Sequence, residues 1–144
     1  MATARTFMNA APEDVFNLLS DAGGYVRWVV GCQQVRQSDR AWPEPGSSFE
    51  HRLGFGPLRL QDITTVVESS PPRRLVLRAR AWPLGEAIIE FRIRPKRDGT
   101  EVEMRQKAAA GPIAALDNPL QDFVTSLRDR ESLRRLRRLA EAGP

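Results

Sequence analysis

The chain has a single histidine, His51, and the pattern around it predicts that this side chain points inward. It lies in the stretch SFEHRLGFGPLRLQD, residues 48–62, which reads as two strands joined by a Gly-Phe-Gly-Pro turn. Phe49, His51 and Leu53 alternate with charged residues, and alternate residues of a strand share one face. An inward-facing histidine is either a satisfied polar group in the core or part of a cavity wall.

Asp62 is the second residue here that could do chemistry. With a turn centred near residues 55 and 56, His51 is expected opposite Leu60, and Asp62 is then a diagonal neighbour on the same face. A carboxylate can orient an imidazole as a general acid or base, and an unperturbed histidine titrates near pH ~6.5. His51 and Asp62 are thus the candidate catalytic residues. The alternatives are a structural polar pair and a histidine at a cavity mouth that does no chemistry.

Common catalytic and nucleotide-binding motifs are absent from the sequence. It contains no G-x-S-x-G, no G-x-x-x-x-G-K-[ST], no H-E-x-x-H and no G-x-G-x-x-G. One histidine and one cysteine, Cys32, exclude an internal disulfide and a zinc site of His and Cys ligands within one chain. We therefore expect neither a metal nor a cofactor.

The middle of the chain, which must position these residues, has the pattern of an antiparallel sheet. Between residues 30 and 106, short runs that alternate apolar and charged residues are separated by turn sequences such as PEPGSS and RDGT. The arginines at 78, 80, 92 and 94 are expected on the solvated face. With a short first strand over 2–9, the expected strands are 30–38, 47–54, 57–68, 74–81, 86–95 and 100–107.

Helices are expected on both sides of this region. Pro12 and the acidic residues after it open a helix in APEDVFNLLSD, and YVRWV forms a second short helix or turn. A long helix follows Gly111 and Pro112 and runs to about Ala142. Its two apolar groups lie on different faces of a straight helix, which predicts a bend over 128–132 or a start in two pieces around 118–119. The groups are Leu116, Leu120, Phe123 and Leu127, then Leu133, Leu136 and Ala140.

Composition predicts one globular domain over residues 1–144. Hydrophobic residues make up 41% and charged residues 28%, and no apolar run approaches the ~18 residues of a membrane span. No secretory signal is visible, so we expect a cytoplasmic protein, either a monomer or a homodimer. The net charge is +4 and 20 of the 22 basic residues are arginine, but they do not alternate with aromatic residues. We interpret the many arginines as a general preference for arginine codons and not as a binding surface. We therefore expect no nucleic-acid binding.

The order of these elements resembles the START-like superfamily, also called SRPBCC, which has the helix-grip fold. The resemblance covers nearly the whole chain and is carried by APEDVFNLLSDAGGYVRWV, DITTVVESSPPRRLVLRA and DRESLRRLRRLAE. Within the superfamily, the chain resembles the polyketide cyclase/dehydrase-like branch and uncharacterised bacterial members. The resemblance implies an α+β fold in which a curved seven-stranded antiparallel sheet wraps around the long C-terminal helix.

It also implies a cavity between sheet and helix for a hydrophobic or amphipathic small molecule. Some members bind or carry ligands, whereas others catalyse aldol cyclisation, dehydration or hydrolysis; no catalytic motif is universal, so no residue role carries over. Three classes remain open: a small-molecule binder, a cofactor-free cyclase/dehydrase-like enzyme, and a nucleic-acid or protein-interaction module. The expected ligand-binding residues are Trp28, Phe49, His51, Leu60, Asp62, Thr64, Leu77, Trp82, Ile89, Phe91, Met104, Phe123 and Leu127.

Overall fold

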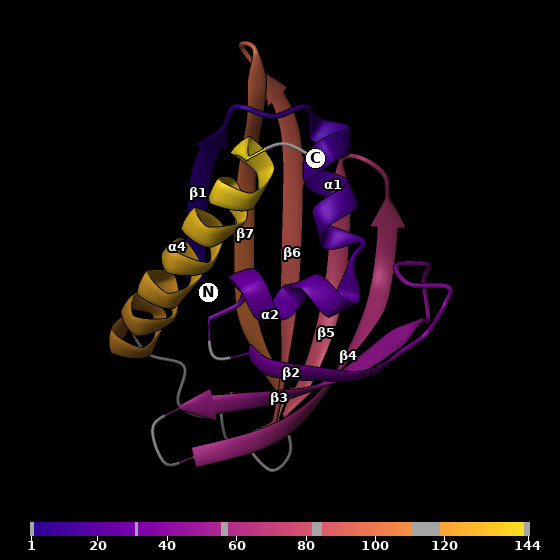
Figure 1. Cartoon of the computed structure of the whole chain (residues 1–144). Helices are drawn as coiled ribbons and strands as arrows, with labels where there is room; N and C mark the ends of the chain where they lie inside the picture. Colours follow the sequence, from indigo (N-terminus) through magenta and orange to yellow (C-terminus); the bar gives the residue numbers. More distant parts are fainter. Residues whose placement is uncertain (1, 31, 56–57, 82–84, 111–118, 143–144) are drawn as a thin grey trace.

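Seven antiparallel strands form one curved sheet in the order β1-β7-β6-β5-β4-β3-β2. The computed structural model describes residues 2–30, 32–55, 58–81, 85–110 and 119–142. The helices lie on one face of the sheet, and β2 and β3 cross the lower ends of β5 to β7, so the sheet curls (Figure 1). The strands are β1 (Ala2–Met8), β2 (Cys32–Ser38), β3 (Ser48–Phe55), β4 (Leu58–Ser70), β5 (Arg74–Ala81), β6 (Gly85–Lys96) and β7 (Gly99–Ala110).

The first helices begin where the sequence predicts. Helix α1 (Pro12–Leu19) has its proline at the first turn and two acidic residues beside it, which complement the positive end of the helix. It buries Val15, Phe16 and Leu19. The short helices η1 (Ala22–Gly24) and α2 (Tyr25–Trp28) follow and place Trp28 in the core.

The C-terminal helix α4 (Pro119–Glu141) packs through its second apolar group, whereas Phe123 and Leu127 of the first group are exposed. Leu133, Leu136 and Ala140 are buried. Polar contacts at two levels tie the helix to the rest of the molecule: Val30 N–H donates to Ser132 Oγ at 3.0 Å, and Asn9 N–H donates to Glu141 Oε2 at 2.8 Å. Residues 111–118, the expected start of this helix, lie outside the described residues.

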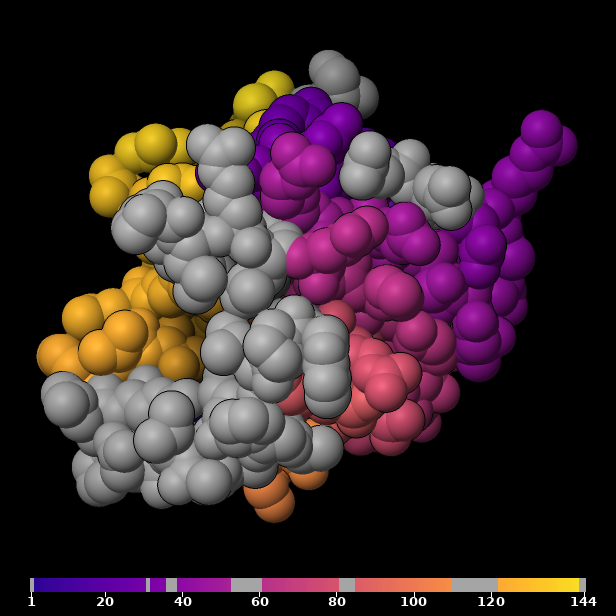
Figure 2. Space-filling model, turned by 90° about the horizontal axis from the view of Figure 1, so that it is seen from below, coloured from indigo at the N-terminus to yellow at the C-terminus, as the bar shows by residue number. Residues whose placement is uncertain are grey.

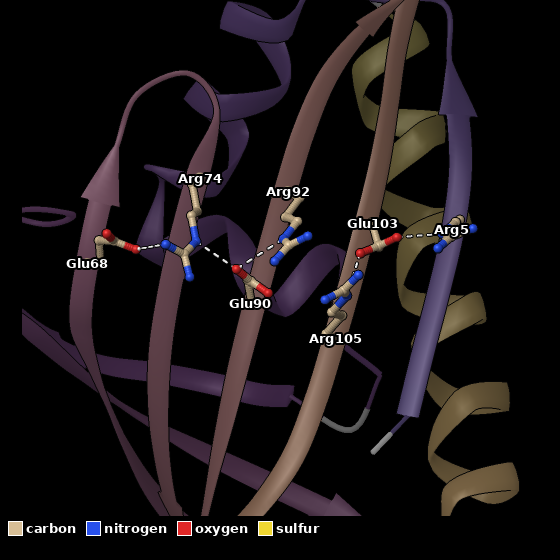
Figure 3. Close-up of polar contacts among 7 residues, drawn as sticks. All are labelled: Arg5, Glu68, Arg74, Glu90, Arg92, Glu103 and Arg105. Carbon is tan, nitrogen blue, oxygen red and sulfur yellow. Dashed lines mark hydrogen bonds and ion pairs between the residues drawn. The ribbon is translucent and has the colours of Figure 1, made fainter.

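The outer face of the sheet carries paired charges (Figure 3). Glu90 on β6 contacts Arg74 on β5 at 2.6 Å and Arg92 at 3.2 Å, and Arg74 also contacts Glu68 at 2.6 Å. Partial burial acts to raise the pKa of Glu90, but the two arginines outweigh it and hold that pKa below its usual range. The positive charge of the arginine-rich face is thus partly neutralised by its own glutamates.

The same arrangement recurs along the sheet. Glu103 lies between Arg5 and Arg105, each at 2.5 Å, and Glu86 contacts Arg80 at 3.3 Å. Arg78, Arg80 and Arg94 are exposed and Arg92 is half-buried, as the alternation predicts. That these arginines bind no nucleic acid stays a prediction. None of the described helices is long and apolar enough to span a membrane.

Candidate functional site

A pocket of about 180 Å³ lies between the inner face of the sheet and helices α2 and α4. Seen from the end of the molecule where α4 begins, α4 (orange) lies on one side and β4 and β5 (pink) on the other (Figure 2). Most of the expected site residues are brought together here, because parity had placed them on the inner side of their strands. The pocket is lined by Trp28, Phe49, His51, Asp62, Thr64, Leu77, Ile89, Phe91 and Met104, among others.

His51 and Asp62 form a direct cross-strand pair. His51 Nε2 lies 3.5 Å from Asp62 Oδ2, and Asp62 Oδ1 accepts a hydrogen bond of 2.9 Å from Arg80 N–H. Only 6% of His51 and 3% of Asp62 is exposed. Both therefore face inward, and neither is a solvated residue of the sheet surface.

The register between β3 and β4 differs from the one that the sequence predicts. His51 is paired with Asp62, and Leu60 is paired with Leu53 instead. The turn lies one residue further on than assumed, between the paired residues Phe55 and Leu58, and each residue of shift in the turn moves the pairing by two. A shift of two preserves the face, so the inward orientation was right although the partner was wrong.

Burial decides the ionisation of this pair. It lowers the pKa of His51 to about 4, and the positive charge of Arg128 acts in the same direction. It raises the pKa of Asp62 to about 6, against the Arg80 backbone hydrogen bond and the charge of Arg128. At neutral pH the imidazole is therefore uncharged and the carboxylate is ionised, so the contact is not an ion pair.

The carboxylate of Asp62 also determines which nitrogen of His51 carries the proton. A neutral imidazole has one N–H, and an ionised carboxylate can only accept, so the proton belongs on Nε2. The lone pair of Nδ1 is then directed elsewhere. Nδ1 is buried and has no hydrogen-bond partner among the residues that the structure describes.

Helix α4 contributes three polar residues to the pocket wall: Arg128, Asp129 and Ser132. Asp129 is fully buried, and burial raises its pKa to about 6 although Arg128 acts to lower it. With its amide nitrogen turned toward Asp129, Gln106 donates to the two carboxylate oxygens at 3.1 and 3.2 Å. Two carboxyl groups with raised pKa values of about 6 thus line one pocket.

Aromatic rings form a continuous part of the wall. The ring of Tyr25 lies 4.8 Å from that of Trp28 and 5.1 Å from that of Phe49, and the rings of Trp28 and Phe91 are 5.9 Å apart. The hydroxyl of Tyr25 donates to Leu19 O at 2.7 Å and is therefore already used. Trp28 Nε1, by contrast, is buried and has no partner among the described residues.

Two expected site residues lie elsewhere. Phe123 and Leu127 were expected among the ligand-binding residues, but 60% of Phe123 and 47% of Leu127 is exposed, and neither residue lines the pocket. Leu127 lies nine positions before Leu136, two and a half turns of a helix with about 3.6 residues per turn, so the two leucines point in opposite directions. The helix buries Leu136, and Leu127 must then face solvent. Trp82 and the side chain of Leu60 lie outside the described residues.

Sequence reasoning missed the polar residues of α4. It treated residues 128–132 only as one of two positions for a break or bend in the helix. A usable signal was present: Asp129 and Ser132 lie seven and four positions before Leu136, the spacing of one helix face. Tyr25, Cys32 and Ala79 also line the pocket and were missed. Among the described residues, no group of three or more His, Cys, Asp or Glu side chains could hold a metal ion.

Comparison with known proteins is consistent with this geometry. The family model described as "Polyketide cyclase / dehydrase and lipid transport" matches residues 2–141. A sequence search of curated proteins finds no match.

Solved structures share the fold at low sequence identity. Protein CV1439 from Chromobacterium violaceum superposes with a TM-score of 0.77 at 18% identity, covering 96% of this chain and 95% of that one. A second similar structure is that of the di-domain ARO/CYC StfQ from the steffimycin biosynthetic pathway. It has a TM-score of 0.76 at 18% identity, covering 97% of this chain and 50% of that one. The Aha1 dimer from Colwellia psychrerythraea has a TM-score of 0.70 at 14% identity, covering 99% and 96%.

Proposed function

The chain belongs to the polyketide cyclase/dehydrase and lipid transport family, and on that premise we propose that its pocket binds one small molecule with an apolar body and a polar end. The observation that carries the proposal is the lining of the pocket. Its wall is mostly aromatic and aliphatic, and a few polar groups, among them His51, Asp62 and Asp129, interrupt it. Ligand sites in proteins have this composition: apolar groups supply affinity and a few polar groups set the orientation.

The energetic cost of an empty pocket supports the same reading. An apolar void that holds neither water nor ligand costs about 24 cal/mol per Å³, so a dry space of about 180 Å³ would cost at most roughly 4 kcal/mol. That is a large part of the total stability of a domain, about 5–15 kcal/mol. A sequence under selection only for folding would fill such a space with larger side chains; Ala79 and Ala87 on the wall leave room for them.

Binding can be tested with 2-naphthalenemethanol, which has an apolar body and one hydroxyl. In 1H–15N NMR spectra we expect saturable shifts at one site, centred on the residues that line the pocket. Ala79→Phe places a benzyl group in the pocket and should abolish these shifts. Ala109→Phe is the control, because Ala109 is exposed and does not line the pocket. Shifts that centre elsewhere, or that survive in a folded Ala79→Phe protein, would contradict the proposal.

Catalysis without a cofactor is a second candidate, and the His51–Asp62 pair favours it. A neutral imidazole whose Nε2–H faces a carboxylate keeps the lone pair of Nδ1 available to accept a proton. Burial lowers the pKa of His51 to about 4, so this nitrogen is a weaker base than that of an exposed histidine. In this role Nδ1 would remove a proton from a carbon next to a carbonyl group, leaving an enolate. Asp62 would hold the ring and stabilise the imidazolium that forms. Proton removal of this kind is a step that cyclisation and dehydration share.

Deuterium exchange tests this step. The methylene protons of 1-(2-naphthyl)-1,3-butanedione should exchange with D2O faster with the protein than in buffer, by on the order of 10²-fold for one positioned base. His51→Phe keeps a ring in place and removes the base, so exchange should return to the buffer rate. If the parent protein and the His51→Phe variant both bind the diketone and give equal exchange rates, His51 is not a base, and only the binding function remains.

A further inference from the structure

We propose that the pocket selects molecules whose polar end is an uncharged hydroxyl and rejects molecules that end in a carboxylate. This inference rests on the proposed binding function and adds the class of ligand. Two features of the pocket carry it: the buried polar atoms that have no partner, and the balance of charges on the wall.

Two buried atoms of the pocket wall that have no partner among the described residues, on His51 and Trp28, have opposite hydrogen-bonding needs. His51 Nδ1 is an acceptor, because the single proton of the neutral ring is on Nε2, facing Asp62. Trp28 Nε1–H is a donor. Leaving a buried polar atom unpaired is costly, so a ligand that pairs with it gains affinity. A hydroxyl group donates and accepts, and so suits either atom, whereas a carboxylate has no proton to give to Nδ1.

The charges on the wall oppose an anionic ligand. Two carboxylates line the pocket, on Asp62 and Asp129, against one guanidinium, on Arg128. The carboxylate of Glu86, a further residue of the pocket wall, is instead paired with Arg78 and Arg80 on the outer face of the sheet, at 3.9 and 3.3 Å. A further carboxylate would be buried beside Asp62 and Asp129, where the low dielectric makes repulsion between like charges strong.

The remaining titratable groups of the wall do not offset this excess of negative charge. Burial raises the pKa of the Cys32 thiol to about 11, so it is neutral at physiological pH. Burial, with a smaller contribution from Asp21, also raises the pKa of the Tyr25 hydroxyl, which stays protonated. His51 is uncharged, as described above.

The test compares two probes that share one frame, 2-naphthalenemethanol and 2-naphthoate, by isothermal titration calorimetry at pH 7.5. We expect the alcohol to bind at least about tenfold more tightly than the carboxylate. Asp129→Asn removes one negative charge with little change in shape and should narrow that ratio by strengthening naphthoate binding. Asp98→Asn is the matched control, because Asp98 is exposed and does not line the pocket, and it should leave the ratio unchanged.

A second measurement uses the unmodified protein. At pH 5.5 the pocket carboxyls, with pKa values of about 6 at Asp62 and Asp129, become largely protonated, whereas a free carboxylate with a pKa near ~4 stays ionised. Naphthoate binding should then strengthen several-fold. Equal binding of the two probes at pH 7.5, or a preference for naphthoate, would overturn the charge selection and leave the binding function standing. Failure of both probes to bind would overturn the binding function itself, and the selection with it.

Discussion

Replacing Leu136 with alanine is expected to lower the free energy of unfolding by about 3–5 kcal/mol. Leu136 is fully buried where α4 meets the core, and its truncation leaves a cavity that close packing on both sides cannot fill. Urea denaturation followed by circular dichroism measures the change. The effect is the largest that we expect from a single substitution, because α4 is held to the sheet mainly by Leu133, Leu136 and Ala140.

Leu127→Ala is the matched control on the same helix. The exchange of residue types is identical, so any effect of helix propensity cancels, but 47% of Leu127 is exposed. We expect it to change the free energy of unfolding by less than about 1 kcal/mol. Equal losses for the two variants, or a larger loss for Leu127→Ala, would show that α4 packs on its other face and that the pocket has a different wall.

Asp129→Asn is expected to raise the free energy of unfolding by about 2–3 kcal/mol at pH 8, and most of this gain should disappear by about pH 4. Burial raises the pKa of Asp129 from 3.8 in the unfolded chain to about 6 in the folded protein. A shift of that size corresponds to about 3 kcal/mol. A carboxyl group whose pKa rises on folding favours the folded state below its unfolded pKa, and this contribution is lost as the pH rises through about 6. Asparagine does not titrate, so the variant does not lose stability as the pH rises.

Thermal and urea unfolding of both proteins between pH 4 and pH 8 measures this difference. His51 titrates in the opposite sense, since its pKa falls on folding, but it is present in both proteins and cancels in the comparison. Asp98→Asn, on the exposed surface, should show no such trend. A variant that is less stable than the parent at pH 8 would mean that Gln106 and Arg128 stabilise the ionised carboxylate by more than burial costs.

The sheet could be predicted from the sequence because strand alternation has a period of two, which determines a face without any knowledge of partners. Leu77 and Phe91 point inward in the structure as their alternation required. His51 and Asp62 do as well, even though their predicted pairing was off by two residues. Register depends on the length of the turn, and a sequence that offers several turn residues in a row, as in Gly-Phe-Gly-Pro, does not specify that length.

The position of α4 could not be obtained in the same way. The sequence determined that a long helix carries two apolar groups on opposite faces, but a single helix can bury only one of them against the sheet. The choice depends on which group fits the space left by α1, α2 and the curved strands, and that is a property of the assembled fold. In the folded protein Leu133 and Leu136 are buried, and Phe123 and Leu127 are exposed. The same rotation carried Arg128, Asp129 and Ser132 into the pocket beside His51, because residues on one face of a helix turn together.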